Sequence, residues 1–160
     1  MSEPTSILPQ QSTCLSHTSE KDRTITVEPK RDTPRIMIVE DDALNLRMLG
    51  DVVQSLGYSI IPTRTGRQAL ELAYLHLPSL ILLDMHLPDI SGIQVCKELR
   101  KQSVFLATPI IAVTALAHAD DKHKALSAGC TEYLVKPVSL DTLLCAISSN
   151  IEIPSQSEFI

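Results

Sequence analysis

The chain has 160 residues, 44% of them hydrophobic, which is enough to bury one core. Its formal net charge of −5 and its 3% of aromatic residues argue against a nucleic-acid-binding surface, which is usually basic or rich in stacking side chains. No segment approaches the ~18 apolar residues of a spanning helix, and the N-terminus has no basic segment followed by an apolar one. We therefore expect a cytoplasmic domain with protein partners and without membrane contact.

Composition divides the chain into three parts. Residues 1–34 are rich in Ser, Thr and Pro and contain no aromatic residue, so we expect a disordered N-terminal tail. The alternating segment at residues 24–27 is too short and isolated to change this. Residues 35–151 form the predicted compact domain, and residues 152–160 form a short C-terminal tail.

The four cysteines are far apart in the sequence. Cys14, Cys96, Cys130 and Cys145 form no CxxC pair and have no adjacent histidine framework, which argues against a zinc site and against a disulfide scaffold. We expect reduced thiols that mostly serve packing.

Short apolar runs predict five strands. The runs beginning at Ile36 and Leu80 are continuous, as expected of strands covered on both faces in a parallel sheet. The predicted strands are residues 36–39, 58–62, 79–84, 109–113 and 132–135.

Apolar residues at helical spacing predict five helices between and after these strands. The expected inward positions include Leu77 and Leu140, and Gly57 stands where a helix C-cap would. The fourth helix has hardly any large apolar side chain apart from Leu126, so we expect it to be the least anchored. The predicted helices are residues 43–56, 65–76, 91–102, 119–128 and 139–150.

The alternation of strands and helices predicts an α/β fold: a flavodoxin-like, doubly wound, five-stranded parallel sheet with five helices. In the strand order 2-1-3-4-5, the switch point lies between the first and third strands, and ligands bind outside the carboxyl ends of the strands there.

Charged and polar residues stand where these strands end. Glu40 and Asp41 follow the first strand and Asp84 ends the third, so their carboxylates share the predicted crevice. Thr114 and Lys136 follow the fourth and fifth strands and join them. Two further carboxylates, Asp42 and Asp89, read as solvated helix-start and turn residues.

Three adjacent carboxylates repel one another unless a cation lies between them. Oxygen ligands with open positions suit Mg²⁺, which also accepts phosphate oxygens. An ionised Asp84 can then act as a nucleophile toward phosphorus, while Lys136 and the Thr114 hydroxyl bind the transferred oxygens.

These segments resemble the response-regulator receiver domain of two-component signalling, and the resemblance extends from Arg35 to about Ile151. The sequence is also similar to stand-alone members that carry only a receiver. The matching segments are Ile-Val-Glu40-Asp41-Asp42, Leu-Leu-Asp84-Met-His-Leu-Pro-Asp-Ile-Ser-Gly92, Val-Thr114-Ala115 and Tyr133-Leu-Val-Lys136-Pro137.

The resemblance implies a role for each matching residue. Asp84 matches the phosphoacceptor, Asp41 the direct Mg²⁺ ligand and Glu40 a ligand acting through water. The backbone carbonyl of His86 completes the metal site in the family, and Lys136, normally followed by a cis proline, binds phosphate. Thr114 and Tyr133 match the switch hydroxyl and the switch aromatic, with Tyr133 expected to exchange an exposed position for a buried one.

Three alternative functions share part of this pattern. A Mg²⁺-dependent Asp-nucleophile phosphatase of the haloacid-dehalogenase type places a second Asp two residues after the nucleophile, where this chain has His86. A flavodoxin-type flavin carrier needs a phosphate loop where this chain has acids. A receiver used only for docking needs none of the catalytic residues, all of which are present.

We therefore expect a phosphorylation-activated switch that catalyses only its own phosphorylation and dephosphorylation. A histidine kinase or histidine phosphotransfer protein would supply the phosphoryl group, and a downstream protein would read it.

Overall fold

A computed structural model describes residues 33–152 of the chain. The predicted N-terminal tail, apart from its last two residues, and nearly all of the predicted C-terminal tail lie outside the described residues. No helix in the described part is long and apolar enough to cross a membrane.

Five parallel strands form one sheet in the order β2-β1-β3-β4-β5, so the predicted fold class and strand order are confirmed. The strands end at or within one residue of the predicted positions, because the apolar runs stop where the chain leaves the sheet. Their bounds are β1 (Arg35–Val39), β2 (Ser59–Thr63), β3 (Leu80–Asp84), β4 (Ile110–Thr114) and β5 (Glu132–Val135).

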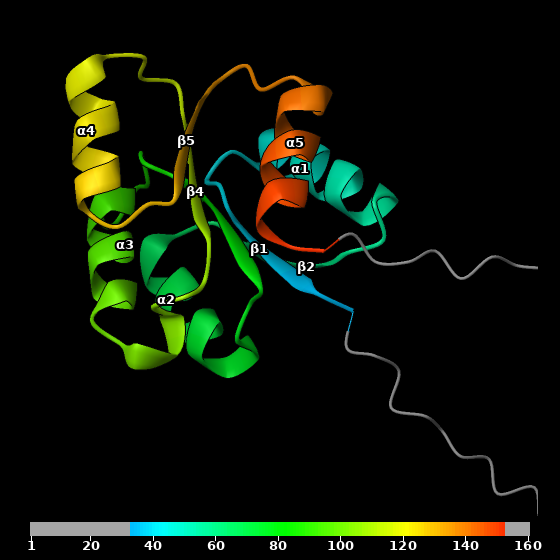
Figure 1. Cartoon of the computed structure of the whole chain (residues 1–160), viewed down its shortest axis with the longest axis horizontal. Helices are drawn as coiled ribbons and strands as arrows, with labels where there is room; N and C mark the ends of the chain where they lie inside the picture. The colour runs from blue at the N-terminus through cyan, green and yellow to red at the C-terminus, as the bar shows by residue number, and fades with distance from the viewer. Residues whose placement is uncertain (1–32, 153–160) are drawn as a thin grey trace, which may run out of the picture. The chain divides into compact units, whose positions relative to one another are not determined.

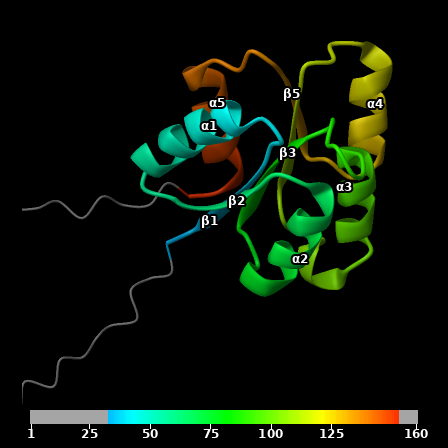
Figure 2. The same ribbon diagram turned by 180° about the vertical axis from the view of Figure 1, so that it is seen from behind.

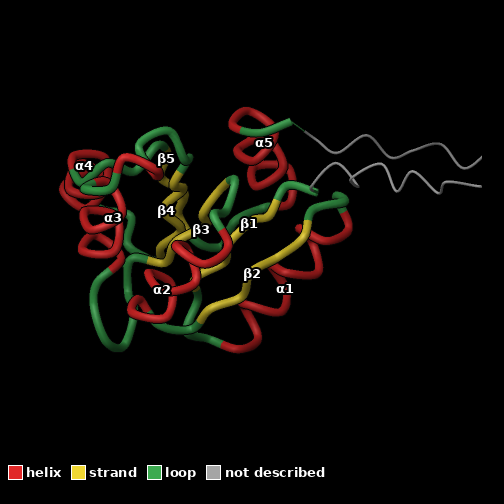
Figure 3. Tube along the Cα trace, turned by 90° about the horizontal axis from the view of Figure 1, so that it is seen from below, coloured by secondary structure: helices red, strands yellow, loops and turns green. Residues whose placement is uncertain are grey.

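Helices cover both faces of this sheet (Figure 1). Helices α1 and α5 lie on one face and α2, α3 and α4 on the other, which is also clear from behind and from below (Figures 2 and 3). Their bounds are α1 (Ala43–Ser55), α2 (Gly66–His76), α3 (Gly92–Arg100), α4 (Ala119–Ser127) and α5 (Leu140–Asn150), with a short 3-10 helix at Ser103–Phe105.

Successive residues of each central strand enter opposite cores. Ile36 and Ile38 pack on the α1 and α5 side, whereas Met37 and Val39 pack on the other side. All five residues of β3 and all five of β4 are buried. Each large apolar side chain removed from water contributes about 1.5–3 kcal/mol, so the continuous runs drive the sheet into the centre.

Four of the five α-helices begin with a side-chain cap. In each, a hydroxyl or carboxylate accepts a hydrogen bond from the amide three residues later, as with Asp42 and the amide of Asn45. Helix α4 instead follows His118, which makes no such bond, and its only buried residue is Ala125. Leu126 is 41% exposed, so α4 is even less anchored than the sequence suggested.

Two inward positions predicted from the helical pattern are wrong. Leu77 follows α2 in the left-handed conformation (φ 47°) and is 55% exposed, because the chain has already left the helical path. Leu140 is the first residue of α5 and is exposed; the buried stripe begins one turn later, at Leu143. A core residue was also missed: Phe105 is buried, and its ring meets Tyr74 edge-on with centroids 5.3 Å apart.

The turn after β3 depends on a close backbone approach at Gly92. Its amide donates to the carbonyl of Met85 at 3.0 Å. A Cβ at this position would overlap the carbonyl oxygen of Asp84 and lie 2.8 Å from the Cα of Met85. Because these are backbone atoms, they cannot rotate away, so only glycine fits.

We expect Gly92→Ala to destabilise the domain by about 1–3 kcal/mol through this overlap. Gly50→Ala is the matched control within a helix, since its Cβ would meet only the flexible Cδ1 of Ile60 at 3.1 Å. Urea unfolding of the two variants measures the difference. Equal free energies of unfolding would contradict the close-approach argument.

Candidate functional site

The carboxylates predicted to meet do meet, at the carboxyl ends of β1 and β3. Carboxylate oxygens of Glu40, Asp41 and Asp84 all lie within 4.8 Å of one another. Glu40 is 2% exposed and Asp84 is 6% exposed, while Asp41 is half-buried. Ionised groups placed so close together and largely out of water need a compensating positive charge.

Lys136, immediately after β5, supplies part of that charge. Its ammonium donates to Oε2 of Glu40 at 2.6 Å and to Oδ2 of Asp84 at 2.9 Å. Burial alone would lower the pKa of Lys136, but the hydrogen bonds that it donates to these two carboxylates raise the pKa above its usual value. Burial also raises the pKa of Glu40, although bonds from Lys136 and from the amide of Asp42 act in the opposite direction.

The neighbouring backbone orients the other carboxylate oxygens. The amide of His86 donates to Oδ1 of Asp84 at 2.8 Å, and the amide of Asp42 donates to Oε1 of Glu40 at 3.2 Å. The side chain of His86 is exposed. The peptide bond between Lys136 and Pro137 is cis, as the resemblance implied.

Arg64, which was not predicted as a site residue, holds the loop that carries Asp41. Its Nε and Nη2 both donate to the main-chain carbonyl of Asp41, at 3.1 and 2.7 Å. The two residues lie 23 positions apart, on the loops after β2 and β1. No local pattern predicts such a contact, because it depends on the pairing of these two strands.

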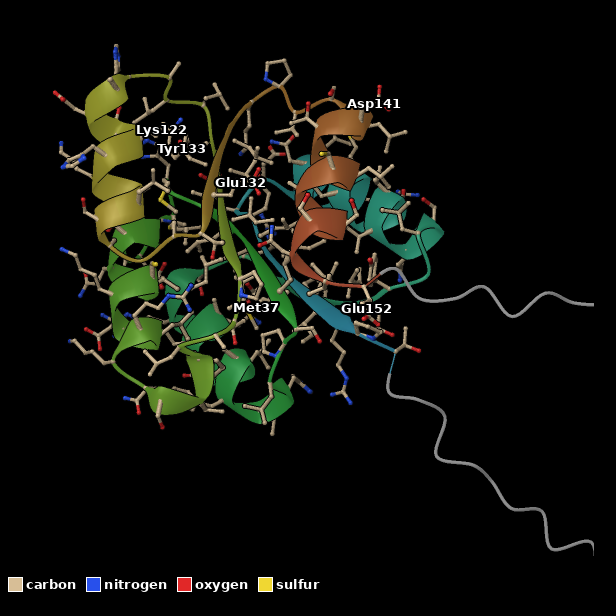
Figure 4. All side chains as sticks on the ribbon, viewed as in Figure 1. Met37, Lys122, Glu132, Tyr133, Asp141 and Glu152 are labelled. Atoms are coloured by element: carbon tan, nitrogen blue, oxygen red, sulfur yellow. The ribbon has the colours of Figure 1, made fainter. Side chains whose placement is uncertain are left out.

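Thr114 and Tyr133 are joined through one backbone residue, Leu116. The Thr114 hydroxyl, fully buried at the end of β4, accepts from the Leu116 amide at 3.2 Å. The Tyr133 hydroxyl donates to the Leu116 carbonyl. Tyr133 lies on β5 beside α4 (Figure 4) and is half-buried.

Of the two carboxylates expected to be solvated, Asp42 is exposed and caps α1. Asp89 is also exposed, but it does more than occupy a turn. Its Oδ1 and Oδ2 accept from the amides of Gly66 and Arg67, each at 2.8 Å, and so cap α2 from a distant loop. Burial acts to raise the pKa of Asp89, but these amide bonds outweigh it and lower the pKa from 3.8 to about 2.

The cap by Asp89 predicts a pH-dependent stability. The folded pKa lies below the unfolded value, so the stabilisation is present above about pH 4 and is lost as the pH falls toward about 2. We expect Asp89→Ala to lower the melting temperature at pH 7 and the difference from the native chain to shrink between pH 4 and 2. Asp89→Asn, which keeps an uncharged acceptor, should fall between the two at pH 7. A pH-independent difference would contradict this account.

A cavity of about 400 Å³ opens beside Lys136, between α1 and the loop after β5. Its walls are mostly apolar. Met48 of α1 is one of the lining residues and is exposed, as is Leu44 in the first turn of the same helix. The lining residues are Glu40, Asn45, Met48, Leu49, Val113, Lys136, Pro137 and Val138.

Comparison with known proteins agrees with this geometry. Residues 36–148 match the family described as the response regulator receiver domain. The chain therefore belongs to the receiver domains of two-component signalling.

Particular relatives and solved structures can be named. The polar-differentiation response regulator DivK of Brucella ovis is 41% identical over 117 residues, which cover 73% of this chain and 95% of that protein. A chemotaxis response regulator of Vibrio cholerae has a TM-score of 0.71 at 28% identity, covering 74% of this chain and 99% of that one. The receiver domain of a Pseudomonas aeruginosa sensor histidine kinase, with magnesium coordinated in its active-site cleft, has a TM-score of 0.69 at 32% identity, covering 74% and 97%.

Proposed function

We propose that the chain is a phosphorylation-activated switch that accepts a phosphoryl group on Asp84 in the presence of Mg²⁺. The observation that carries the proposal is the clustering of three carboxylates around a lysine that already bonds two of them. A structural ion pair alone would need one carboxylate for each ammonium, whereas this site leaves two formal negative charges without a partner.

The residues fit a magnesium ion. Oxygen ligands from Glu40, Asp41 and Asp84 lie within reach of one position, and the excess charge of the cluster matches that of a divalent cation. The carbonyl of His86 would add a neutral oxygen, as expected from the resemblance. When bound, the ion would neutralise charge on the incoming phosphoryl oxygens and so allow an anionic donor to approach.

Phosphoryl transfer then needs only groups already in place. A carboxylate oxygen of Asp84 attacks phosphorus, the bond from phosphorus to the donor breaks, and an acyl phosphate forms. Lys136 lies 2.9 Å from Oδ2 of Asp84 and can follow the new phosphoryl oxygen. The amide of His86 keeps Oδ1 oriented during the reaction.

We propose that the Thr114 hydroxyl is the group that responds to the phosphorylation of Asp84. Its oxygen accepts from Leu116, which leaves the hydroxyl proton free to be donated to a phosphoryl oxygen. A shift of this hydroxyl disturbs the Leu116 amide and, through the Leu116 carbonyl, the hydroxyl of Tyr133. Because α4 buries only one of its side chains, it yields more readily than α2 or α3.

Partners follow from the same surfaces. We propose that a histidine kinase or histidine phosphotransfer protein docks over the apolar cavity beside Lys136, since this places a phosphohistidine next to Asp84. The face built by α4, β5 and α5 is proposed to bind a downstream protein in the cytoplasm. Nucleic acid and membrane are not part of the proposal.

A Mg²⁺-dependent phosphatase is the second reading, and it is less well supported. The residue two positions after Asp84 is His86, whose side chain is exposed and whose amide, not its imidazole, bonds Asp84. The position from which phosphatases of the haloacid-dehalogenase type protonate the leaving group therefore carries no carboxylate. We propose that the domain acts on its own phosphoryl group and on no separate substrate.

The first test of the function is labelling with acetyl phosphate. We expect Mg²⁺-dependent, base-labile labelling that maps to Asp84 and is lost in Asp84→Asn. Asp41→Ala should abolish labelling, so that adding Mg²⁺ no longer has an effect. Asp42→Asn is the matched control, because this neighbouring carboxylate lies outside the cluster and the amide preserves the cap on α1. Labelling that persists in Asp84→Asn would contradict the assignment.

A second test separates the switch from phosphoryl binding. Beryllofluoride with Mg²⁺ mimics the phosphoryl group, and we expect it to shift amide signals at the site and along α4 and β5. Thr114→Ala should suppress the shifts along α4 and β5 while still binding beryllofluoride, and Thr114→Ser should restore them because it keeps the hydroxyl. Equal distal responses in Thr114→Ala and the native chain would refute the coupling through Leu116.

A further inference from the structure

Outside the acidic site, the structure brings together two cysteines that the sequence separates by 34 positions. Cys96 of α3 and Cys130, just before β5, have their Sγ atoms 3.6 Å apart. Cys96 is fully buried and Cys130 is 6% exposed. Both thiols are free and buried, as expected of packing cysteines, but the sequence did not predict that they meet.

The two thiols are held in an ordered chain of contacts. The Cys130 thiol donates to Sγ of Cys96, and the Cys96 thiol donates to the carbonyl of Ala128 at 3.4 Å. Arg100 fixes the same turn, since its Nε donates to the carbonyl of Gly129 at 2.9 Å. Gly129 adopts a φ of 110°, and the Arg100 side chain covers it, so the turn that presents Cys130 is well defined.

We propose that Cys96 and Cys130 form a redox site that is oxidised by hydrogen peroxide to an intramolecular disulfide. A disulfide needs an S–S distance of about 2.05 Å, so side-chain rotation has to bring the sulfurs together by roughly 1.5 Å. At 3.6 Å the two sulfurs are already in contact, which is where that rotation would start.

The surroundings decide which sulfur reacts first. The hydrogen bond from Cys130 is the main cause that lowers the pKa of Cys96, and the nearby Arg100 guanidinium adds to it against the effect of burial. The pKa of Cys130 is raised, chiefly because its proton is held in that same bond. Because Cys96 is the sulfur that accepts the hydrogen bond in this pair, we assign it as the attacking thiol and Cys130 as the resolving thiol.

The chemistry balances with peroxide as the only co-reactant. The Cys96 thiolate attacks one oxygen, the O–O bond breaks, and the departing hydroxide leaves as water with the thiol proton. Sulfur is then a sulfenic acid. Cys130 attacks that sulfur, the S–O bond breaks, and a second water carries away the Cys130 proton. Two electrons pass from the two sulfurs to the peroxide.

Helix α4 determines both how the oxidant reaches the two thiols and what the disulfide does to the domain. Cys130 follows this weakly anchored helix, so local opening of α4 admits a small oxidant. Once formed, the disulfide would tie the turn after α4 to α3 and restrict the movement of α4. This consequence rests on the switch proposed above, whereas the disulfide itself does not.

Mass spectrometry of the full chain after mild peroxide treatment tests the site. In a Cys145→Ser background, trypsin separates the peptides that carry Cys96 and Cys130, since Lys97 and Lys124 lie between them. We expect one linked peptide pair that joins Cys96 to Cys130. When both samples are denatured and alkylated, both thiols should be alkylated at least tenfold less in the peroxide-treated protein than in the untreated protein. Linkage to Cys14, or free Cys96 and Cys130 at peroxide levels that oxidise Cys14, would overturn the proposal.

Two controls complete the test. Cys96→Ala removes the linked peptides and leaves Cys130 available for alkylation, and dithiothreitol reverses the linkage in the unsubstituted chain. The oxidised protein should still accept a phosphoryl group on Asp84 but show weaker distal shifts with beryllofluoride. If linkage forms and the distal shifts are unchanged, the restriction of α4 is refuted; if no labelling occurs in the reduced protein, the proposed function fails independently of the disulfide.

Discussion

The repulsion between three carboxylates at one edge of the sheet is the constraint on which this structure depends. Removing an ionised group from water costs several kcal/mol, and Glu40 and Asp84 are both almost wholly buried. The ammonium of Lys136 between them is what makes the arrangement tolerable. Lys136 therefore has a structural role, in addition to the phosphate-binding role proposed for it.

The parallel sheet brings these charged residues together at one edge. Parallel strands that are apolar throughout must be buried on both faces, so the first polar residues after them emerge together at the same edge. Gly92 lets the chain turn closely behind Asp84, and Arg64 fixes the carbonyl of Asp41 from a neighbouring loop. The charged residues thus lie on loops, while the strands of the sheet fix the positions of those loops.

Sequence reasoning succeeded where a periodic or terminal signal existed. The strand and helix pattern predicted the topology, and strand-end residues such as Asp84 and Lys136 fell where expected. It failed for contacts between distant segments. Asp89 accepts hydrogen bonds from the start of α2, and Cys96 meets Cys130, only after the layers pack. No pattern among the neighbouring residues in the sequence predicts either contact.

The supports around Asp84 are unevenly distributed. On the side of α2, Asp89 is bonded to two amides and Gly92 is packed against backbone, so this loop is clamped. On the side of α4, Leu116 has a single hydrogen bond through its amide and a single one through its carbonyl. The loop on the side of α2 is therefore held by more contacts than the loop on the side of α4. Under the proposed switch, this asymmetry would direct a change at Asp84 toward α4 and away from α2.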